Sequence, residues 1–210
     1  ERIGAMKKQV IVALGREFGS GGHYVGEKIA EYFGISYYDR RILEDIAEEK
    51  NIRIEYLEKY DEQKRNIFFS RSVNGYTNSI EEIVAEMQFE YLRKKASSGE
   101  SFVIVGRCAD ELFRGDERLV SIFVLGDKED RIKRVSKRHN ISLEEAAVKV
   151  ARHDKSRKKY HNRHSEIKWG DSRGYDICIN STRLGIDKTA ELLEAFIRER
   201  TGLEPQAHKG

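Results

Sequence analysis

A glycine-rich stretch near the amino terminus contains the residue types that bind phosphate. Residues 15–22 read GREFGSGG, and Gly19, Gly21 and Gly22 allow successive backbone N–H groups to point inward toward an anion. A helix that starts directly after the glycines adds free N–H groups and the positive end of its dipole. This stretch therefore predicts a phosphate site formed by backbone groups.

The same stretch departs from the phosphate-loop motif G-x-x-x-x-G-K-[ST] in its side chains. Arg16 stands at the first glycine, Gly22 at the lysine and His23 at the serine or threonine. The lysine normally reaches the transferred phosphate, so a phosphoryl-transfer site here needs another cation. Arg16, Arg40 and arginines further along the chain are the candidates.

Two other interpretations of the glycines remain open. They could form a flexible turn between a strand and a helix and bind nothing. They could also belong to a dinucleotide fingerprint G-x-G-x-x-G, since Gly19 and Gly21 fit and Asp39 follows at about the right distance. Tyr24 occupies the third glycine, where close packing of helix and strand is needed, and it disfavours the dinucleotide interpretation.

Strands and helices alternate along the chain and position these residues. Apolar runs typical of buried strands are separated by segments with helical period, which predicts a parallel sheet covered on both faces, an α/β fold. Gly34 is expected to end the first helix, and Ser142 with Glu145 predicts a capping box. The predicted strands are Val10–Leu14, Ile35–Tyr38, Phe102–Val105, Val120–Leu125 and Ile177–Ile179.

Charged residues follow three of the predicted strands. The glycine loop follows the first, Asp39-Arg40-Arg41 the second, and Gly106-Arg107 the third. Ligands of open parallel sheets bind outside the carboxyl ends of the strands. The loop and the arginines should therefore meet at one edge of the sheet.

In its glycine loop and in the arginines that follow its strands, the chain resembles the cytidylate kinase-like family. Members of this family are relatives of bacterial cytidylate kinase among the P-loop nucleoside monophosphate kinases. The matching segments run in order from about residue 8 to about residue 200. They are GREFGSGGHYVG, ISYYDRRIL, FVIVGRCAD, EDRIKRV, RHDKSRKKYHNRH and WGDSRGYDICINSTRLGID.

The resemblance implies a P-loop NTPase-like three-layer sandwich with a five-stranded parallel sheet. A single domain would cover residues 6–202, with a helical acceptor-binding part at about 40–98 and a lid part at about 140–172. Residues 203–210 would form a tail. Met6 is expected to be the natural start, so residues 1–5 would be a remnant added in front of it.

Roles carried over from the family fall on individual positions. Arg107 matches the arginine of a Gly-Arg-Asp motif, in which Cys108 here replaces the aspartate, and Asp154 with Arg157 matches the Asp-x-x-Arg of the lid. The donor phosphates would be held by Gly19, Ser20, Gly21, Gly22 and His23. The acceptor would be held by Asp39, Arg41, Arg107, Arg134 and Asp154. Asn180 and Ser181 would lie near the donor base. The residues themselves, apart from the resemblance, indicate Arg16, Arg152 and Arg157 as the catalytic cations: Arg16 could replace the lysine, and Asp154 lies between the other two and could orient a guanidinium.

The expected function is phosphoryl transfer from ATP, with Mg²⁺ implied by the family, to a nucleoside monophosphate, CMP or dCMP foremost, or to a related small phosphate acceptor. No single residue is assigned to the metal: the hydroxyl at position 23 is missing, so the ion would be held through water, through Ser20 or by a carboxylate such as Asp39 or Glu17. Loss of the lysine leaves an alternative: a degenerate kinase that binds a nucleotide and senses it. A second alternative is a basic nucleic-acid binder, suggested by the cations of residues 152–164 with Tyr160 and Trp169.

Composition limits these alternatives. The formal net charge is +3, from 39 basic and 36 acidic residues, and this near balance disfavours nucleic acid as a partner. No apolar run reaches the roughly 18 residues of a membrane span, so the cytoplasm is the expected location.

Cys108 and Cys178 show no metal spacing and are expected to be free thiols. Residues 51–78, with Ile67, Phe68 and Phe69, suggest an acceptor-binding subdomain or a self-association surface, so a homo-oligomer remains open.

Overall fold

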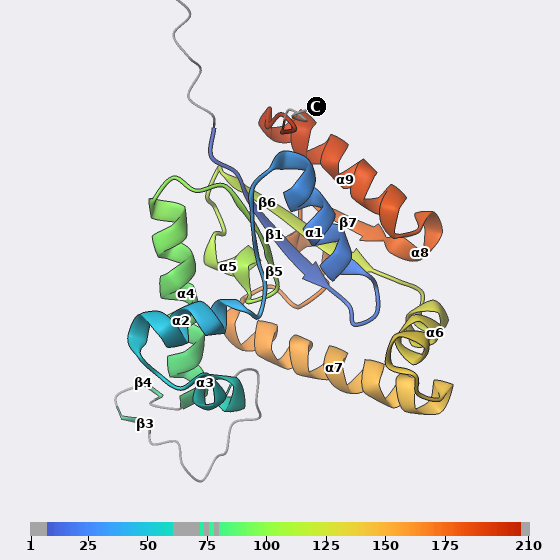
Figure 1. The fold of residues 1–210 in the computed structure, drawn as a ribbon, viewed down its shortest axis with the longest axis horizontal. Coiled ribbons are helices and arrows are strands. Elements are labelled where there is room, and N and C mark those ends of the chain that lie inside the picture. Colours follow the sequence, from blue (N-terminus) through green and yellow to red (C-terminus); the bar gives the residue numbers. More distant parts are fainter. Residues whose placement is uncertain (1–7, 61–71, 74–75, 78–79, 207–210) are drawn as a thin grey trace, which may run out of the picture.

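A five-stranded parallel sheet forms the centre of the protein in the computed structural model, which describes residues 8–60, 72–73, 76–77 and 80–206. The strand order is β2-β5-β1-β6-β7 (Figure 1). All five strands predicted from the sequence are confirmed, with ends that shift by a residue or two. They are β1 (Ile11–Arg16), β2 (Ser36–Tyr38), β5 (Phe102–Val105), β6 (Leu119–Leu125) and β7 (Ile177–Asn180).

Helices cover both faces of this sheet, because successive strand side chains point to opposite sides. On one face, Val12 and Leu14 pack with α1 (Gly22–Phe33) and α9 (Ile186–Thr201). On the other face, Ile11 and Ala13 pack with α2 (Ile42–Lys50), α3 (Ile54–Tyr60), α4 (Ile80–Ser97) and α5 (Ala109–Leu112). Both cores are nearly closed to solvent, so the central strands have little freedom to shift.

Two further helices cross the edge of the sheet at which the strands end (Figure 1). They are α6 (Lys128–His139) and α7 (Leu143–His164). The capping box at the start of α7 is confirmed: Ser142 Oγ accepts from the Glu145 N–H, and the Glu145 carboxylate accepts from the Ser142 N–H. Val135 of α6 packs against Ala146 and Val150 of α7, so the two helices form a small core of their own.

Short elements complete the fold: β3 (Ser72–Val73), β4 (Tyr76–Thr77), the 3-10 turn η1 (Ser172–Gly174) and α8 (Ser181–Leu184). The expectation for residues 51–78 falls largely outside the described residues, which include neither Ile67, Phe68 nor Phe69. The helices within the described ranges include none with the length and apolar character that a membrane crossing requires.

Candidate phosphate-binding site

The glycine loop joins the end of β1 to the start of α1, as predicted. Gly19 and Gly21 have φ of 82° and 84°, a left-handed conformation that costs glycine little and most other residues more. Ser20 between them is fully buried, and its hydroxyl donates to the Glu17 carbonyl at 2.9 Å. Ser181 at the start of α8 donates to the Ser20 carbonyl. The loop is therefore held by one hydrogen bond within itself and by another from the start of α8.

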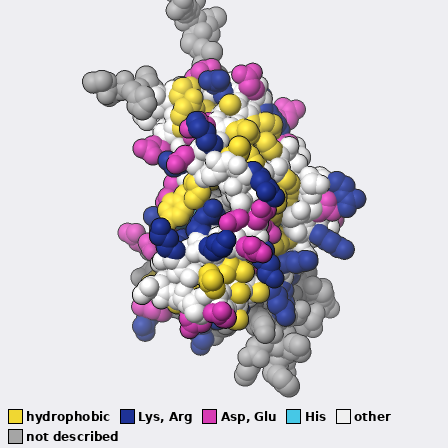
Figure 2. Space-filling model, turned by 90° about the vertical axis from the view of Figure 1, so that its right-hand side faces the viewer, with side chains coloured by type: hydrophobic (Ala, Val, Ile, Leu, Met, Phe, Trp, Pro, Cys, Tyr) yellow, Lys and Arg dark blue, Asp and Glu magenta, His cyan; other side chains and the backbone are white. Residues whose placement is uncertain are grey.

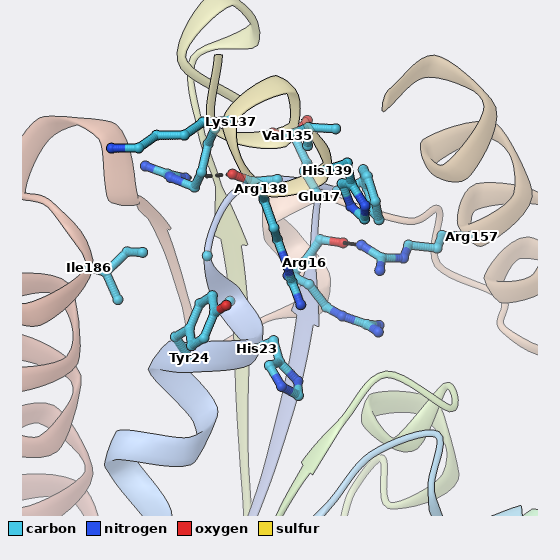
Figure 3. Close-up of a pocket in the computed structure, with 15 residues that line it drawn as sticks. Arg16, Glu17, His23, Tyr24, Val135, Lys137, Arg138, His139, Arg157 and Ile186 are labelled. Atoms are coloured by element: carbon cyan, nitrogen blue, oxygen red, sulfur yellow. Dashed lines mark hydrogen bonds between the residues drawn. The ribbon is translucent and has the colours of Figure 1, made fainter. Parts of the chain in front are cut away.

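A cavity of about 640 Å³ lies over this loop (Figure 3). Tyr24 and His23 of α1 border it on one side and Arg138 of α6 on the opposite side, while Arg157 and Ile186 lie at its two ends. Five cations from three elements line it: Arg16 of β1, Arg134, Lys137 and Arg138 of α6, and Arg157 of α7. Such a concentration of positive charge over a backbone anion nest suits a polyphosphate.

Arg16 occupies the space in which a side chain at position 22 would start. A Cβ built on Gly22 would lie 2.6 Å from Arg16 Cβ and 3.1 Å from Arg16 Cγ. A Cβ on Gly106, at the end of β5, would collide with Arg16 Nη1. The Arg16 side chain therefore runs from the glycine loop toward the turn that bears Arg107, and glycine at both positions makes room for it.

Phe18 attaches the glycine loop to α7. Its N–H donates to Asp154 Oδ1 at 2.7 Å, and its carbonyl accepts from Arg131 Nη1 at 3.1 Å. Arg131 Nη1 also lies 2.6 Å from Asp154 Oδ2, and the Arg131 side chain is only 8% exposed. The Phe18 ring stacks on His153 with centroids 4.1 Å apart, and the Arg157 guanidinium lies 5.3 Å from the ring centroid. Helix α7 is thus a fixed wall of the cavity at this point.

Two of the predicted arginines contact the loop backbone directly. Arg157 Nη1 donates to the Arg16 carbonyl at 3.1 Å, and Arg134 Nη1 donates to the Gly19 carbonyl. Both side chains are half-buried, which limits their rotamers. They therefore present guanidinium groups at fixed places beside the loop.

A second group of charged residues lies at the ends of β2 and β5. Asp39 is buried, and its Oδ1 accepts from the backbone N–H and the Nε of Arg41, at 2.9 and 3.0 Å. Arg107 is 3% exposed, donates from Nη1 to Gln88 Oε1 at 3.1 Å, and has its guanidinium 5.8 Å from the ring centroid of Tyr160. These two strand ends adjoin the loop, as expected from the parallel sheet.

His23 connects the loop to this second group. Its Nδ1 lies 2.8 Å from the Tyr37 hydroxyl and 3.6 Å from Asp39 Oδ2, and its Nε2 lies 3.3 Å from Glu27 Oε1. Burial first, and then the Asp39 and Glu27 carboxylates, raise the pKa of Tyr37. Tyr37 therefore stays a neutral phenol near neutral pH and can donate to the histidine ring.

The remaining predicted residues lie apart from the cavity. Arg152 is exposed and lines a separate shallow depression with Glu144 and Val148. Asp154 binds the guanidinium of Arg131, a residue that was not predicted from the sequence to belong to the site. Asn180 caps α8 by accepting from the Thr182 N–H and donates to Asp127.

Several residues of the site were not predicted from the sequence. Phe18, Arg131, Lys137, Arg138 and Gln88 have side chains that a single sequence shows only as members of amphipathic helices or of the loop. One signal was available: Arg131, Arg134 and Arg138 recur every three or four residues, which places them along one face of α6.

Comparison with known proteins agrees with this geometry. An α/β sheet with a glycine loop between its first strand and first helix, facing an arginine-lined cavity, is the arrangement of the P-loop kinase fold. The model of the cytidylate kinase-like family matches residues 11–183, and the chain belongs to this family. The resemblance and the three-layer fold expected from the sequence are therefore confirmed.

Individual relatives of modest sequence identity support the same assignment. A cytidylate kinase from Pyrococcus horikoshii is 28% identical over 193 residues, covering 91% of this chain and 90% of the relative. A crystal structure of an uncharacterized protein from Eubacterium ventriosum is 37% identical with a TM-score of 0.71, covering 90% of this chain and 98% of that one. Shikimate kinase from Bacteroides thetaiotaomicron shares the fold, with a TM-score of 0.54 at 13% identity over 90% of this chain and 98% of that one.

Membership of this kinase family implies ATP and usually Mg²⁺, and the residues present fit a weakly held magnesium ion. Mg²⁺ is typically held by one or two carboxylates and the substrate phosphates and keeps several waters. Asp39 is the carboxylate beside His23, the position at which other P-loops place their metal-binding hydroxyl. A magnesium ion held here would depend on Asp39 and on the nucleotide phosphates.

Proposed function

We propose that the protein is an ATP-dependent kinase that phosphorylates a nucleoside monophosphate, CMP or dCMP foremost. The observation that carries this proposal is the set of arginines around the glycine loop, with a second charged group at the ends of β2 and β5. A donor triphosphate needs the first set and an acceptor phosphate needs the second. Two anion-binding groups that adjoin at one sheet edge suit transfer between two nucleotides.

Arg16 would supply the positive charge that the missing lysine gives in other P-loops. Phosphoryl transfer depends on positioning and charge neutralisation more than on covalent chemistry. A guanidinium stays charged at any physiological pH and binds phosphate oxygens bidentately. Arg16 leaves the chain six residues before the lysine position, yet its stem lies against Gly22.

The other arginines have distinct proposed roles. Arg157 and Arg134 would neutralise the donor phosphates beside the loop, because both already contact its backbone. Arg107 and Arg41 would hold the acceptor, with Asp39 orienting Arg41. Asp154 would act indirectly by fixing Phe18 and Arg131, although the family pattern implies an acceptor contact. When bound, Mg²⁺ would neutralise charge on the phosphates next to Asp39.

One observation favours the alternative of a sensor that binds nucleotide without transfer. Arg157 and Arg134 each donate a hydrogen bond to a loop carbonyl, so part of their donor capacity serves the loop itself. A nucleic-acid binder has less support. Figure 2 shows basic and acidic side chains interspersed over the face it presents, without a continuous basic surface there.

A coupled assay separates these functions. The protein is incubated with ATP, Mg²⁺ and CMP, dCMP, UMP, AMP or GMP in turn, and ADP formation is measured against a reaction without acceptor. We expect turnover with CMP or dCMP above the others. If no acceptor is phosphorylated while ATP still raises the melting temperature, the sensor function replaces the kinase function.

A further inference from the structure

A cysteine, an aspartate and a histidine meet in the interior, outside the phosphate cavity. Cys108 and Asp110 belong to the turn after β5 and to the start of α5, whereas His161 comes from the last turns of α7. His161 Nε2 lies 2.7 Å from Asp110 Oδ2, and Cys108 Sγ lies 3.9 Å from the His161 carbonyl. One ligand atom from each residue lies within 4.8 Å of the other two. The proposed kinase reaction uses none of these three side chains.

Burial makes this cluster unusual. Cys108, Asp110 and His161 are 4%, 7% and 6% exposed. Among the described residues, His161 Nδ1 has no hydrogen-bond partner, and neither does the nearby Tyr175 hydroxyl, although both atoms are closed to solvent. A buried polar atom without a partner loses its hydrogen bonds to water and gains none in return. A group that binds at this cluster could use such an atom.

Thiolate, imidazole and carboxylate together are the donor set of a borderline transition metal such as Zn²⁺. Zinc bonds of about 2.0 Å to nitrogen and oxygen and about 2.3 Å to sulfur place tetrahedral ligand atoms about 3.5 Å apart. A side-chain shift of about 1 Å would bring the three atoms to that spacing from the observed limit of 4.8 Å. Magnesium is disfavoured, since it prefers oxygen ligands alone.

We propose that Cys108, Asp110 and His161 form a zinc site that joins helix α7 to the turn after β5. Binding forms one bond from the metal to each side chain and releases the thiol proton of Cys108 to solvent. Water or the Tyr175 hydroxyl completes the fourth position. The site would hold α7 against the residue next to Arg107, and it is separate from the magnesium expected at the phosphate loop.

A route for the metal exists from the opposite side of the cluster. Asp110 and Tyr175 line a polar cavity of about 340 Å³, bordered also by Arg114, Asp116 and Asp176. The three side chains are buried, yet Asp110 lines this polar cavity directly. A hydrated ion can approach through this cavity without unfolding of the core.

Metal binding by the chelator-stripped full chain tests the proposal without reference to kinase activity. Zn²⁺ is titrated in competition with a chromogenic chelator, and Co²⁺ serves as a spectroscopic probe. We expect one equivalent of tight binding, a thiolate-to-cobalt charge-transfer band and a zinc-dependent rise in melting temperature. Cys108→Ser should lose the band and bind zinc at least about tenfold more weakly, since loss of even a residue that hydrogen-bonds to a metal ligand typically weakens binding by that factor.

Cys178→Ser is the matched control, because Cys178 is the other free thiol and lies on β7 outside the cluster. It should retain the band and the affinity. His161→Gln should also lose zinc, and circular dichroism shows whether that variant is folded. The proposal is wrong if the wild type takes up no equivalent of zinc, or if Cys108→Ser binds it as tightly as the wild type. The kinase assay can fail without affecting either outcome.

Discussion

Arg16 and Gly22 fit together in space: a Cβ at position 22 would lie 2.6 Å from the Cβ of Arg16, closer than nonbonded carbons approach. The two departures from the motif are therefore coupled. Arginine at the first glycine position requires glycine at the lysine position, because the two side chains would overlap. The stem of Arg16 fills the volume in which a lysine would begin. Under the proposed function, this packing would let Arg16 supply the positive charge that the lysine supplies in other P-loops.

A double-mutant cycle tests this coupling. Arg16→Gly should lower kcat by about 10²- to 10³-fold, the cost of removing a charge-stabilising donor. Gly22→Lys alone should also lower kcat, because its Cβ displaces Arg16. Arg16→Gly with Gly22→Lys restores the G-x-x-x-x-G-K spacing as GEFGSGK and should recover a large part of the activity. If the fall in kcat of the double variant equals the product of the two single falls, positions 16 and 22 act independently and the proposed coupling is wrong.

Asp154 is expected to be important for stability. Without Asp154, the buried Arg131 keeps Glu17, 3.3 Å from its Nε, as an ion-pair partner but loses the acceptor of its Nη1, so Asp154→Ala should destabilise the protein by about 1–3 kcal/mol. It also removes the acceptor of the Phe18 N–H. Urea unfolding measures the change.

Arg152→Ala, two residues away on the exposed side of α7, is the control and should alter stability by less than about 0.5 kcal/mol. The same pair of variants separates two roles in catalysis. Since Arg152 lies away from the cavity, its removal should leave kcat near that of the wild type. A large fall in kcat for Arg152→Ala with unchanged stability would instead require that α7 moves to bring Arg152 to the phosphates.

Gln88 is expected to position Arg107. It is fully buried on α4 and accepts from Arg107 Nη1. Gln88→Leu should raise KM for the acceptor about fivefold, corresponding to one hydrogen bond of about 1 kcal/mol, and change KM for ATP little. Initial rates with each substrate varied in turn show the difference. Equal changes in both KM values would point to general loosening of the fold.

Stability should decrease on the acid side of neutrality because of His164. Its ring is half-buried between Phe89 and Tyr160, and burial, with a smaller effect of Arg163, lowers its pKa below 6.5. Below pH 6.5 the unfolded chain binds a proton here that the folded protein resists, so the free energy of unfolding falls as pH falls. His164→Phe, which keeps the ring contacts, should show a shallower slope in urea titrations between neutral pH and the folded pKa. An unchanged slope would assign the pH dependence to other groups.

The sequence by itself determined the fold and the backbone part of the site. Five apolar runs and the helices between them specify a parallel sheet covered on both faces, since the central strands are buried along nearly their whole length and the apolar residues of each helix recur on one side. The order of the glycine loop, Asp39 and Arg107 after successive strands places them at one edge, because parallel strands end together. Local chemistry also specified the capping box of Ser142 and Glu145.

Only the tertiary structure decided which side chains act together. Cys108 and His161 lie 53 residues apart, and their contact depends on α7 crossing beneath the turn after β5. Asp154 pairs with Arg131 and not with its neighbour Arg152, because helical rotation turns Arg152 to the other side of α7. Likewise, the sequence shows that the lysine is missing, but only packing shows Arg16 lying over Gly22. Side-chain partners across helices depend on crossing angles and rotamers, which a periodic pattern does not encode.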